Sequence, residues 1–151
     1  MLLLMKLAHI LSIIVWVGGM FFAYVVLRPV AVDVLQPPER LRLWDKVFNK
    51  FFNWVWLAVF LVLVSGFYMI YLFGGFANLS LYINIMLTMG LVMTTIYVYV
   101  FFKCYAPFSR FVAKQEWPAA GAMLGTIRKL VGLNLSIGLL TVAVAIIGKS
   151  L

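Results

Sequence analysis

Four long apolar stretches occupy most of this 151-residue chain, and they restrict its possible folds more than any other feature. They lie at about residues 2–27, 54–73, 79–102 and 119–148. About 20 consecutive apolar residues are needed for one α-helix to cross the hydrocarbon core of a bilayer. A helix also satisfies its backbone N–H and C=O groups within one segment, as lipid requires. We therefore predict an all-α fold, an integral membrane four-helix bundle.

The overall composition agrees with lipid as the main solvent of the chain. Hydrophobic residues make up 66% of the sequence and charged residues 11%, whereas a soluble domain is roughly a quarter charged. Four crossings nearly exhaust the chain, so we expect a single transmembrane domain over residues 1–151. The net charge of +8 is explained by membrane topology and anionic headgroups. The expected partner is the lipid bilayer and not nucleic acid.

The segment between the first two apolar stretches has an amphipathic pattern. Pro37, Pro38 and Glu39 suit the first turn of a helix, where proline is tolerated and an acid meets the positive end of the dipole. Apolar residues then recur at steps of three and four, at Leu41, Trp44, Val47, Phe48, Phe51 and Phe52. Charged and polar residues fill the other face. The pattern predicts a short interfacial helix at about residues 39–53.

The basic residues predict an orientation in the membrane. The first connection contains Arg28, Arg40, Arg42, Lys46 and Lys50. The third contains Lys103, Arg110 and Lys114, and Arg128 and Lys129 follow in the first part of the fourth stretch, which is expected to project out of the membrane. The second connection, residues 74–78, contains none. The positive-inside rule then places the first and third connections in the cytoplasm. We expect a multi-pass protein of a bacterial-type inner membrane with both termini outside the cytoplasm. Pro29 and Pro107 are expected to end or interrupt helices.

His9 is the only histidine, and it lies in the first apolar stretch. On a helix, Met5 and Met20 fall on the same face as His9. Thioethers are soft ligands suited to Cu(I), and imidazole binds copper as well. Met5 is one turn from His9, whereas Met20 is about 16 Å further along the helix and would belong to a second station. The alternative is a histidine that only packs, with methionine as a flexible core residue.

The third apolar stretch carries a second methionine stripe. Met86, Met89 and Met93 follow one another at steps of three and four residues. Asn84, Thr88 and Thr95 lie on the opposite face. Because polar side chains hold membrane helices together, the asparagine–threonine face is expected to point into the bundle. If the methionines point inward instead, they extend a Cu(I) path.

Haem b is a second possible cofactor, with His9 as one axial ligand. A single histidine excludes bis-histidine ligation within one chain. No acidic residue lies in an apolar stretch, and no complete catalytic motif is present. The single cysteine, Cys104, excludes an internal disulfide and is expected to be inert. The sequence favours a non-enzymatic role without deciding the question.

Several motifs resemble the copper-resistance D (CopD) membrane family. They are KLAHI at residues 6–10, WVGGMFF at 16–22, RLW at 42–44, FFNWVW at 51–56, SG at 65–66, IRKLV at 127–131, NL at 134–135 and GLLTV at 138–142. The resemblance covers most of the chain. It implies a four-helix bundle with a role in copper uptake or tolerance.

The start of the chain is also similar, more distantly, to HemJ-type membrane proteins. The similarity rests on His9, on Trp16 seven residues later and on the glycines that follow at 18 and 19. It implies a haem b-binding redox protein. HemJ-type proteins continue with an arginine and a second histidine, and this chain has Tyr24 and Val26 in that neighbourhood.

The leading hypothesis is an inner-membrane protein that handles or transports copper, with His9, Met5 and Met20 as metal ligands. One alternative is a haem b-binding redox protein with His9 as the axial ligand. Another is a non-catalytic subunit that assembles with itself or with a larger membrane complex.

Overall fold

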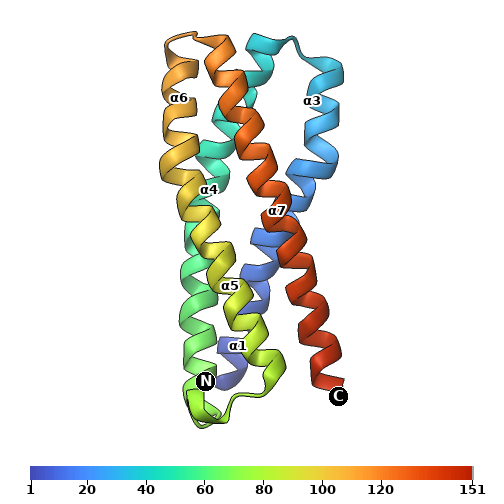
Figure 1. The fold of residues 1–151 in the computed structure, drawn as a ribbon, viewed down its shortest axis with the longest axis vertical. Helices are drawn as coiled ribbons and strands as arrows, with labels where there is room; N and C mark the ends of the chain where they lie inside the picture. Colours follow the sequence, from blue (N-terminus) through green and yellow to red (C-terminus); the bar gives the residue numbers. More distant parts are fainter. Residues whose placement is uncertain (151) are drawn as a thin grey trace.

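The computed structural model describes residues 1–150, which form four long helical segments joined by short connections (Figure 1). The segments run Leu2–Val34, Pro37–Leu72, Leu81–Ala113 and Trp117–Ser150, and we call them the first to fourth spanning helices. Each is long and apolar enough to cross a membrane. Within residues 1–150 there is no β-strand. The predicted all-α membrane bundle of four helices is confirmed.

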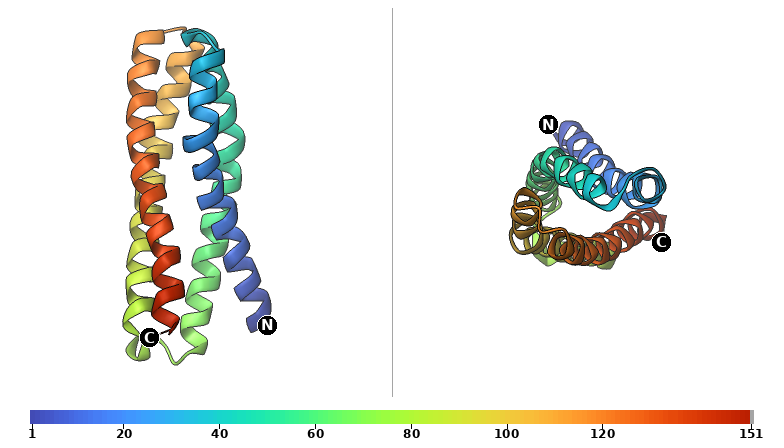
Figure 2. Two further views of the ribbon diagram at one scale, coloured as in Figure 1. Left: turned by 90° about the vertical axis from the view of Figure 1, so that its right-hand side faces the viewer. Right: turned by 90° about the horizontal axis from the view of Figure 1, so that it is seen from above.

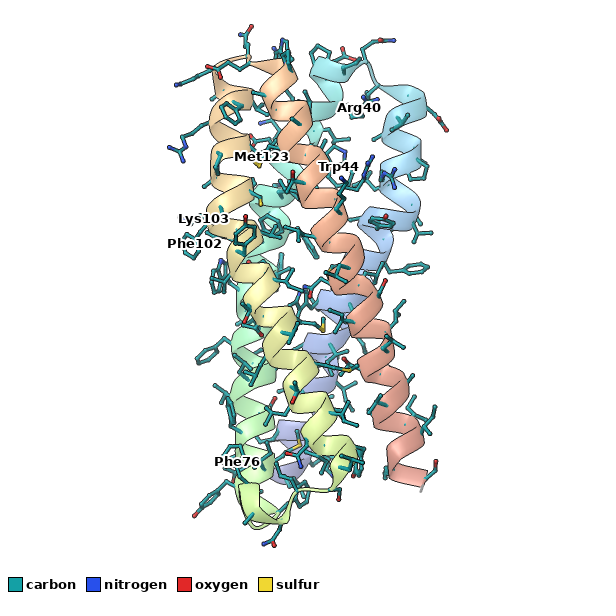
Figure 3. The ribbon with its side chains drawn as sticks, in the orientation of Figure 1. Arg40, Trp44, Phe76, Phe102, Lys103 and Met123 are labelled. Atoms are coloured by element: carbon teal, nitrogen blue, oxygen red, sulfur yellow. The ribbon has the colours of Figure 1, made fainter. Side chains whose placement is uncertain are left out.

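Successive spanning helices run in opposite directions. Both chain ends and the connection over residues 73–80 lie at one end of the bundle, which we call the terminal end (Figures 1 and 2). The connections at residues 35–36 and 114–116 lie at the other end, the basic end. The first and third connections therefore lie at one end of the bundle, and the second connection and both termini lie at the other, as the charge pattern predicts. Figure 3 shows Arg40 at the basic end and Phe76 at the terminal end.

The first and third spanning helices each contain a π-helical segment followed by a proline. The first consists of α1 (Leu2–Ile13), η1 (Ile14–Gly18), α2 (Gly19–Phe21), η2 (Phe22–Leu27) and α3 (Arg28–Val34). The third consists of α5 (Leu81–Tyr99), η4 (Val100–Tyr105) and α6 (Ala106–Ala113). Both η2 and η4 are π-helical and end two residues before Pro29 and Pro107, respectively.

The expectation that these two prolines end or interrupt helices is wrong. Pro29 and Pro107 each occupy the second position of an α-helical segment, and the spanning helix continues past them. A proline inside an α-helix removes one N–H and clashes with the carbonyl four residues earlier. A π-helical turn contains one residue more than an α-helical turn. The carbonyl four residues before the proline is therefore displaced from the position where it would clash.

The second spanning helix, α4 (Pro37–Leu72), is unbroken. The separate interfacial helix predicted at residues 39–53 is therefore wrong, because these residues form the first half of α4. Their apolar face is buried within the bundle and not in lipid, since Leu41, Trp44 and Phe48 are each at most 6% exposed. A helix of this length measures about 50 Å, against about 30 Å of hydrocarbon. The pattern is amphipathic because one face of this half of α4 packs into the bundle core.

An aromatic cluster explains why the first half of α4 joins the bundle. The ring of Phe48 lies 5.1 Å from that of Trp44 and 5.2 Å from that of Phe52. Tyr105 of η4 packs edge-on against Phe52, with ring centroids 5.1 Å apart. Phe108 of α6 packs against Phe48 and is fully buried. Aromatic pairs at such distances add to the stabilisation that burial alone provides.

Local backbone preferences explain the connection between α4 and α5. Gly74 and Gly75 both have positive φ angles, +97° and +78°, which glycine adopts without steric cost. A short 3-10 turn, η3 (Phe76–Asn78), leads from them into α5.

The fourth spanning helix, α7 (Trp117–Ser150), contains the predicted stretch 119–148. It packs against α5 along its length, and α1 packs against α4.

Candidate metal site

His9 lies on α1 and faces α4. Its Nδ1 atom is 2.9 Å from the Ser65 hydroxyl oxygen and 3.1 Å from the Val62 carbonyl oxygen. Ser65 is only 1% exposed. A Cβ placed on Gly66 would lie 3.5 Å from the Cε1 atom of His9, an ordinary van der Waals distance, so the imidazole packs directly against this part of α4. The Ser65–Gly66 pair therefore serves a close contact between two helices.

The hydrogen bonds determine which imidazole nitrogen is available for a ligand. A carbonyl oxygen can only accept, so Nδ1 must carry the proton that it shares with the Val62 carbonyl. The Ser65 hydroxyl donates to the Leu61 carbonyl oxygen at 2.5 Å and can therefore accept from the same Nδ1–H. The Nε2 atom then keeps its lone pair. Metal-binding histidines almost always donate their second ring N–H in this way.

Met5 is the nearest thioether along the helix. It is half-buried and four residues before His9, on the same face of α1. Residues spaced by four on a helix have Cβ atoms about 5–6 Å apart. A soft Cu(I) ion can be held at that spacing by one sulfur and one imidazole nitrogen.

Met20 lies in a different part of the bundle. It belongs to α2, is 3% exposed and is eleven residues beyond His9, or about 16 Å along the helix. It lines a small cavity of about 30 Å³ together with Trp16, Tyr97 and Asn134. Asn134 is 3% exposed, and its Oδ1 atom has no hydrogen-bond partner within residues 1–150. Met20 and His9 cannot ligate the same ion.

The methionines of α5 point into the bundle. Met93 is 4% exposed, and the Met89 sulfur lies 3.4 Å from the Thr141 hydroxyl of α7. The expectation that the asparagine–threonine face points inward is wrong, because Asn84, Thr88 and Thr95 are all exposed. The two threonine hydroxyls donate to carbonyl oxygens four residues earlier in their own helix. They need no partner on another helix, so the bulkier methionines fill the interface.

The remaining metal-binding side chains do not converge. Among residues 1–150, no group of three or more His, Cys, Asp and Glu side chains is close enough to hold an ion. Cys104 is 2% exposed and belongs to the aromatic core around Phe48. Neither the 30 Å³ cavity nor a larger cavity at the basic end is lined by His9. The candidate metal site is therefore His9 with Met5.

The contact between His9 and α4 is the feature that sequence reasoning missed. In the sequence, Ser65 and Gly66 are identified only as a short motif of the CopD resemblance. A serine directly before a glycine in an apolar helix is the only signal of this contact in the sequence. It indicates that another helix can approach closely at this position, but it does not identify the residue on that helix that makes the contact.

Comparison with known proteins identifies a family for most of the chain. Residues 45–147 match the sequence model of the family described as CopD, copper resistance protein D. No curated protein and no solved structure matches the chain. The matched segment covers most of the second helix and nearly all of the third and fourth, and it begins after Met5, His9 and Met20. The chain belongs to the CopD family of copper resistance proteins, as a multi-pass membrane protein with four spanning helices.

Proposed function

We propose that this protein binds Cu(I) in the membrane and handles or transports it, with His9 Nε2 and Met5 Sδ as the first ligands. The observation that carries the proposal is the pair of hydrogen-bond contacts at His9 Nδ1. The Nδ1–H is held by the Val62 carbonyl and by Ser65, so Nε2 is left as the free donor atom. Membership of a copper-resistance family supports copper as the ion.

The ligand set supports the cuprous state over Cu(II). One imidazole and one thioether form a soft, low-coordinate set, whereas Cu(II) prefers several nitrogen and oxygen donors in a square arrangement. The half-buried side chains around His9 are mostly apolar, and they provide no carboxylate. Met20 is the next sulfur on the same face, and we assign it to a second station further into the bundle.

The direction of the site relative to the cell is part of the proposal. His9 lies towards the terminal end of the bundle, opposite the arginine-rich connections. Under the positive-inside rule the terminal end faces away from the cytoplasm of a bacterial-type inner membrane. Copper would then meet His9 and Met5 first when it arrives from outside.

A binding titration tests this proposal. The purified protein in detergent is titrated against a chromophoric Cu(I) chelator, and its bound copper is measured together with its absorption spectrum. We expect about one Cu(I) per chain in the high-affinity phase and a strong loss of that phase in the His9→Ala variant. The control is Met93→Leu, which changes a buried methionine away from the site. A protein that binds no Cu(I), or that binds it equally after His9→Ala, would overturn the proposal. A Soret band that is present in the unchanged protein and lost in His9→Ala would show that His9 binds haem and not copper.

A further inference from the structure

A large cavity at the basic end has a different character from the His9 site. It measures about 430 Å³ and lies between the end of the first spanning helix and the first turns of α4 and α7. Volumes of this size are typical of sites for small organic ligands. In Figure 1 the ribbon of α3 stands apart from those of α4 and α7 at this end, where the cavity lies. The metal-binding proposal does not use this cavity.

The walls of the cavity are apolar and its charges are all positive. Tyr24, Trp44 and Ile127 are among the residues that form the walls. Three arginines line it, Arg28 from α3, Arg40 from α4 and Arg128 from α7. None of its lining residues, all of them within residues 1–150, is acidic. Three arginines from three different helices therefore line one mostly apolar space, and none of the other lining residues carries a carboxylate.

The arginines are placed where a headgroup would meet them. Arg28 and Arg40 are half-buried, and Arg128 is exposed. The guanidinium carbon of Arg28 lies 5.3 Å from the centre of the Tyr24 ring, a cation–π contact that orients the side chain beside the cavity. A guanidinium group binds a phosphate through two parallel N–H donors, which gives both strength and geometry.

The cavity opens beside an exposed apolar surface of the first spanning helix. Val32 lines the cavity and is nevertheless 54% exposed. Its neighbour Val30 is 51% exposed, and Val25 and Val26 are 48% and 43% exposed. An exposed apolar surface of this kind suits acyl chains better than water. A soluble anion would occupy only the polar rim and leave the apolar wall uncovered, whereas a lipid covers both.

We propose that the cavity binds one anionic phospholipid from the surrounding membrane. The phosphate lies among Arg28, Arg40 and Arg128, and one acyl chain enters the apolar space beside Trp44 and Ile127. Basic pockets between spanning helices suit anionic headgroups for this reason. The lipid connects the end of the first spanning helix to α4 and α7, where the protein leaves a gap.

Two glycines make the acyl-chain part of the proposal testable. Gly121 and Gly125 line the cavity from α7, one turn apart. A Cβ added at either position would meet no atom within 4 Å. A leucine at Gly125 would therefore fill the cavity without disturbing the protein. Gly90 of α5 also has open space around it and does not line the cavity, so Gly90→Leu is the matched control.

The test is native mass spectrometry of the full-length protein in detergent after removal of bound lipid. It is titrated with phosphatidylglycerol, with phosphatidylcholine of the same acyl chains, and with glycerol 1-phosphate as a headgroup without chains. We expect phosphatidylglycerol to bind most tightly. Loss of one charge-assisted hydrogen bond in Arg28→Gln, Arg40→Gln or Arg128→Gln should weaken it about tenfold. Lys129→Gln, which removes an exposed neighbouring charge outside the cavity, should leave it unchanged.

Each result decides for or against the lipid. Equal binding of the two phospholipids, or equal effects of Lys129→Gln and the arginine variants, would overturn the role of charge. Glycerol 1-phosphate that competes as well as phosphatidylglycerol would show a site for a free anion. If Gly125→Leu binds phosphatidylglycerol as tightly as the unchanged protein, the acyl chain does not occupy the cavity. These outcomes are independent of Cu(I) binding, so failure of one proposal leaves the other intact.

Discussion

The Nδ1 atom of His9 lies 2.9 Å from the Ser65 hydroxyl oxygen, although the two residues are 56 positions apart in the chain. This contact joins the first and second spanning helices and fixes the imidazole so that Nε2 is its free donor atom. Ser65 and the Val62 carbonyl thus together orient the only histidine and leave Nε2 as its free donor atom. Removal of the Ser65 hydroxyl is the most direct test of that role.

Ser65→Ala should weaken Cu(I) binding without removing a ligand. Loss of a hydrogen-bond partner behind a metal-binding histidine typically lowers metal affinity about 10- to 100-fold. The affinity is measured by competition with a Cu(I) chelator. The matched control is Ser136→Ala on α7, because that serine also bonds a carbonyl four residues earlier and is exposed. If both variants bind copper like the unchanged protein, Ser65 does not support a metal ligand.

Met5→Leu should separate the two candidate ligands on α1. Leucine keeps the apolar volume and removes the sulfur, so the fold should be preserved while Cu(I) affinity falls. Met20→Leu should leave the high-affinity phase intact, because Met20 is about 16 Å from His9 along the helix. The measurement is the number and affinity of Cu(I) ions bound per chain. The opposite pattern, with Met20 essential and Met5 dispensable, would place the first site deeper in the bundle.

Tyr97→Phe should lower the free energy of unfolding by about 1 kcal/mol. The Tyr97 hydroxyl donates to the Phe52 carbonyl oxygen at 3.0 Å, and the residue is 4% exposed. The phenyl ring keeps its packing against Trp16 and Trp56, so only the hydrogen bond is lost. Equilibrium unfolding in mixed micelles measures the change. Tyr99→Phe is the control, since Tyr99 is 53% exposed, and an equal loss there would contradict the assignment.

Gly138→Leu should destabilise the bundle by about 1–3 kcal/mol through overpacking. A Cβ at Gly138 would already lie 3.0 Å from a Val17 methyl group and 3.1 Å from the terminal carbon of Met93. The first, third and fourth spanning helices meet at this point. Gly90→Leu, which faces open space, should change stability little. Comparable melting temperatures for the two variants would show that the helices are less closely packed than the structure indicates.

The orientation in the membrane can be measured with single cysteines in a Cys104→Ala background. Asn78→Cys at the terminal end should react with a membrane-impermeant maleimide added to spheroplasts. Lys114→Cys at the basic end should react only after the membrane is opened. Both native residues are exposed, so accessibility within the fold does not confound the comparison. The reverse labelling pattern would invert the proposed topology.

The small residues of α7 illustrate how far sequence reasoning reached. The spacing of Gly132 and Ser136, with Gly138 following, predicts helix packing within the bundle or between copies. Gly132 faces Tyr24 and Gly138 faces Val17 and Met93, so these two glycines pack within the bundle. Ser136 is exposed and bonds its own helix. Spacing identified the small residues, but it could not distinguish the glycines that meet neighbours from the serine that meets lipid.

The sequence by itself determined the four spanning helices, the tight glycine turn and the placement of ten of the twelve basic residues towards one end. These features depend on local hydrophobicity, charge and backbone preference, which each segment carries independently of its neighbours. The tertiary structure decided that residues 39–53 belong to a long buried helix, that the methionines of α5 face inward and that His9 meets Ser65. These features depend on contacts between segments remote in the chain. Amphipathic spacing shows that a face is buried, but only packing decides whether lipid or another helix buries it.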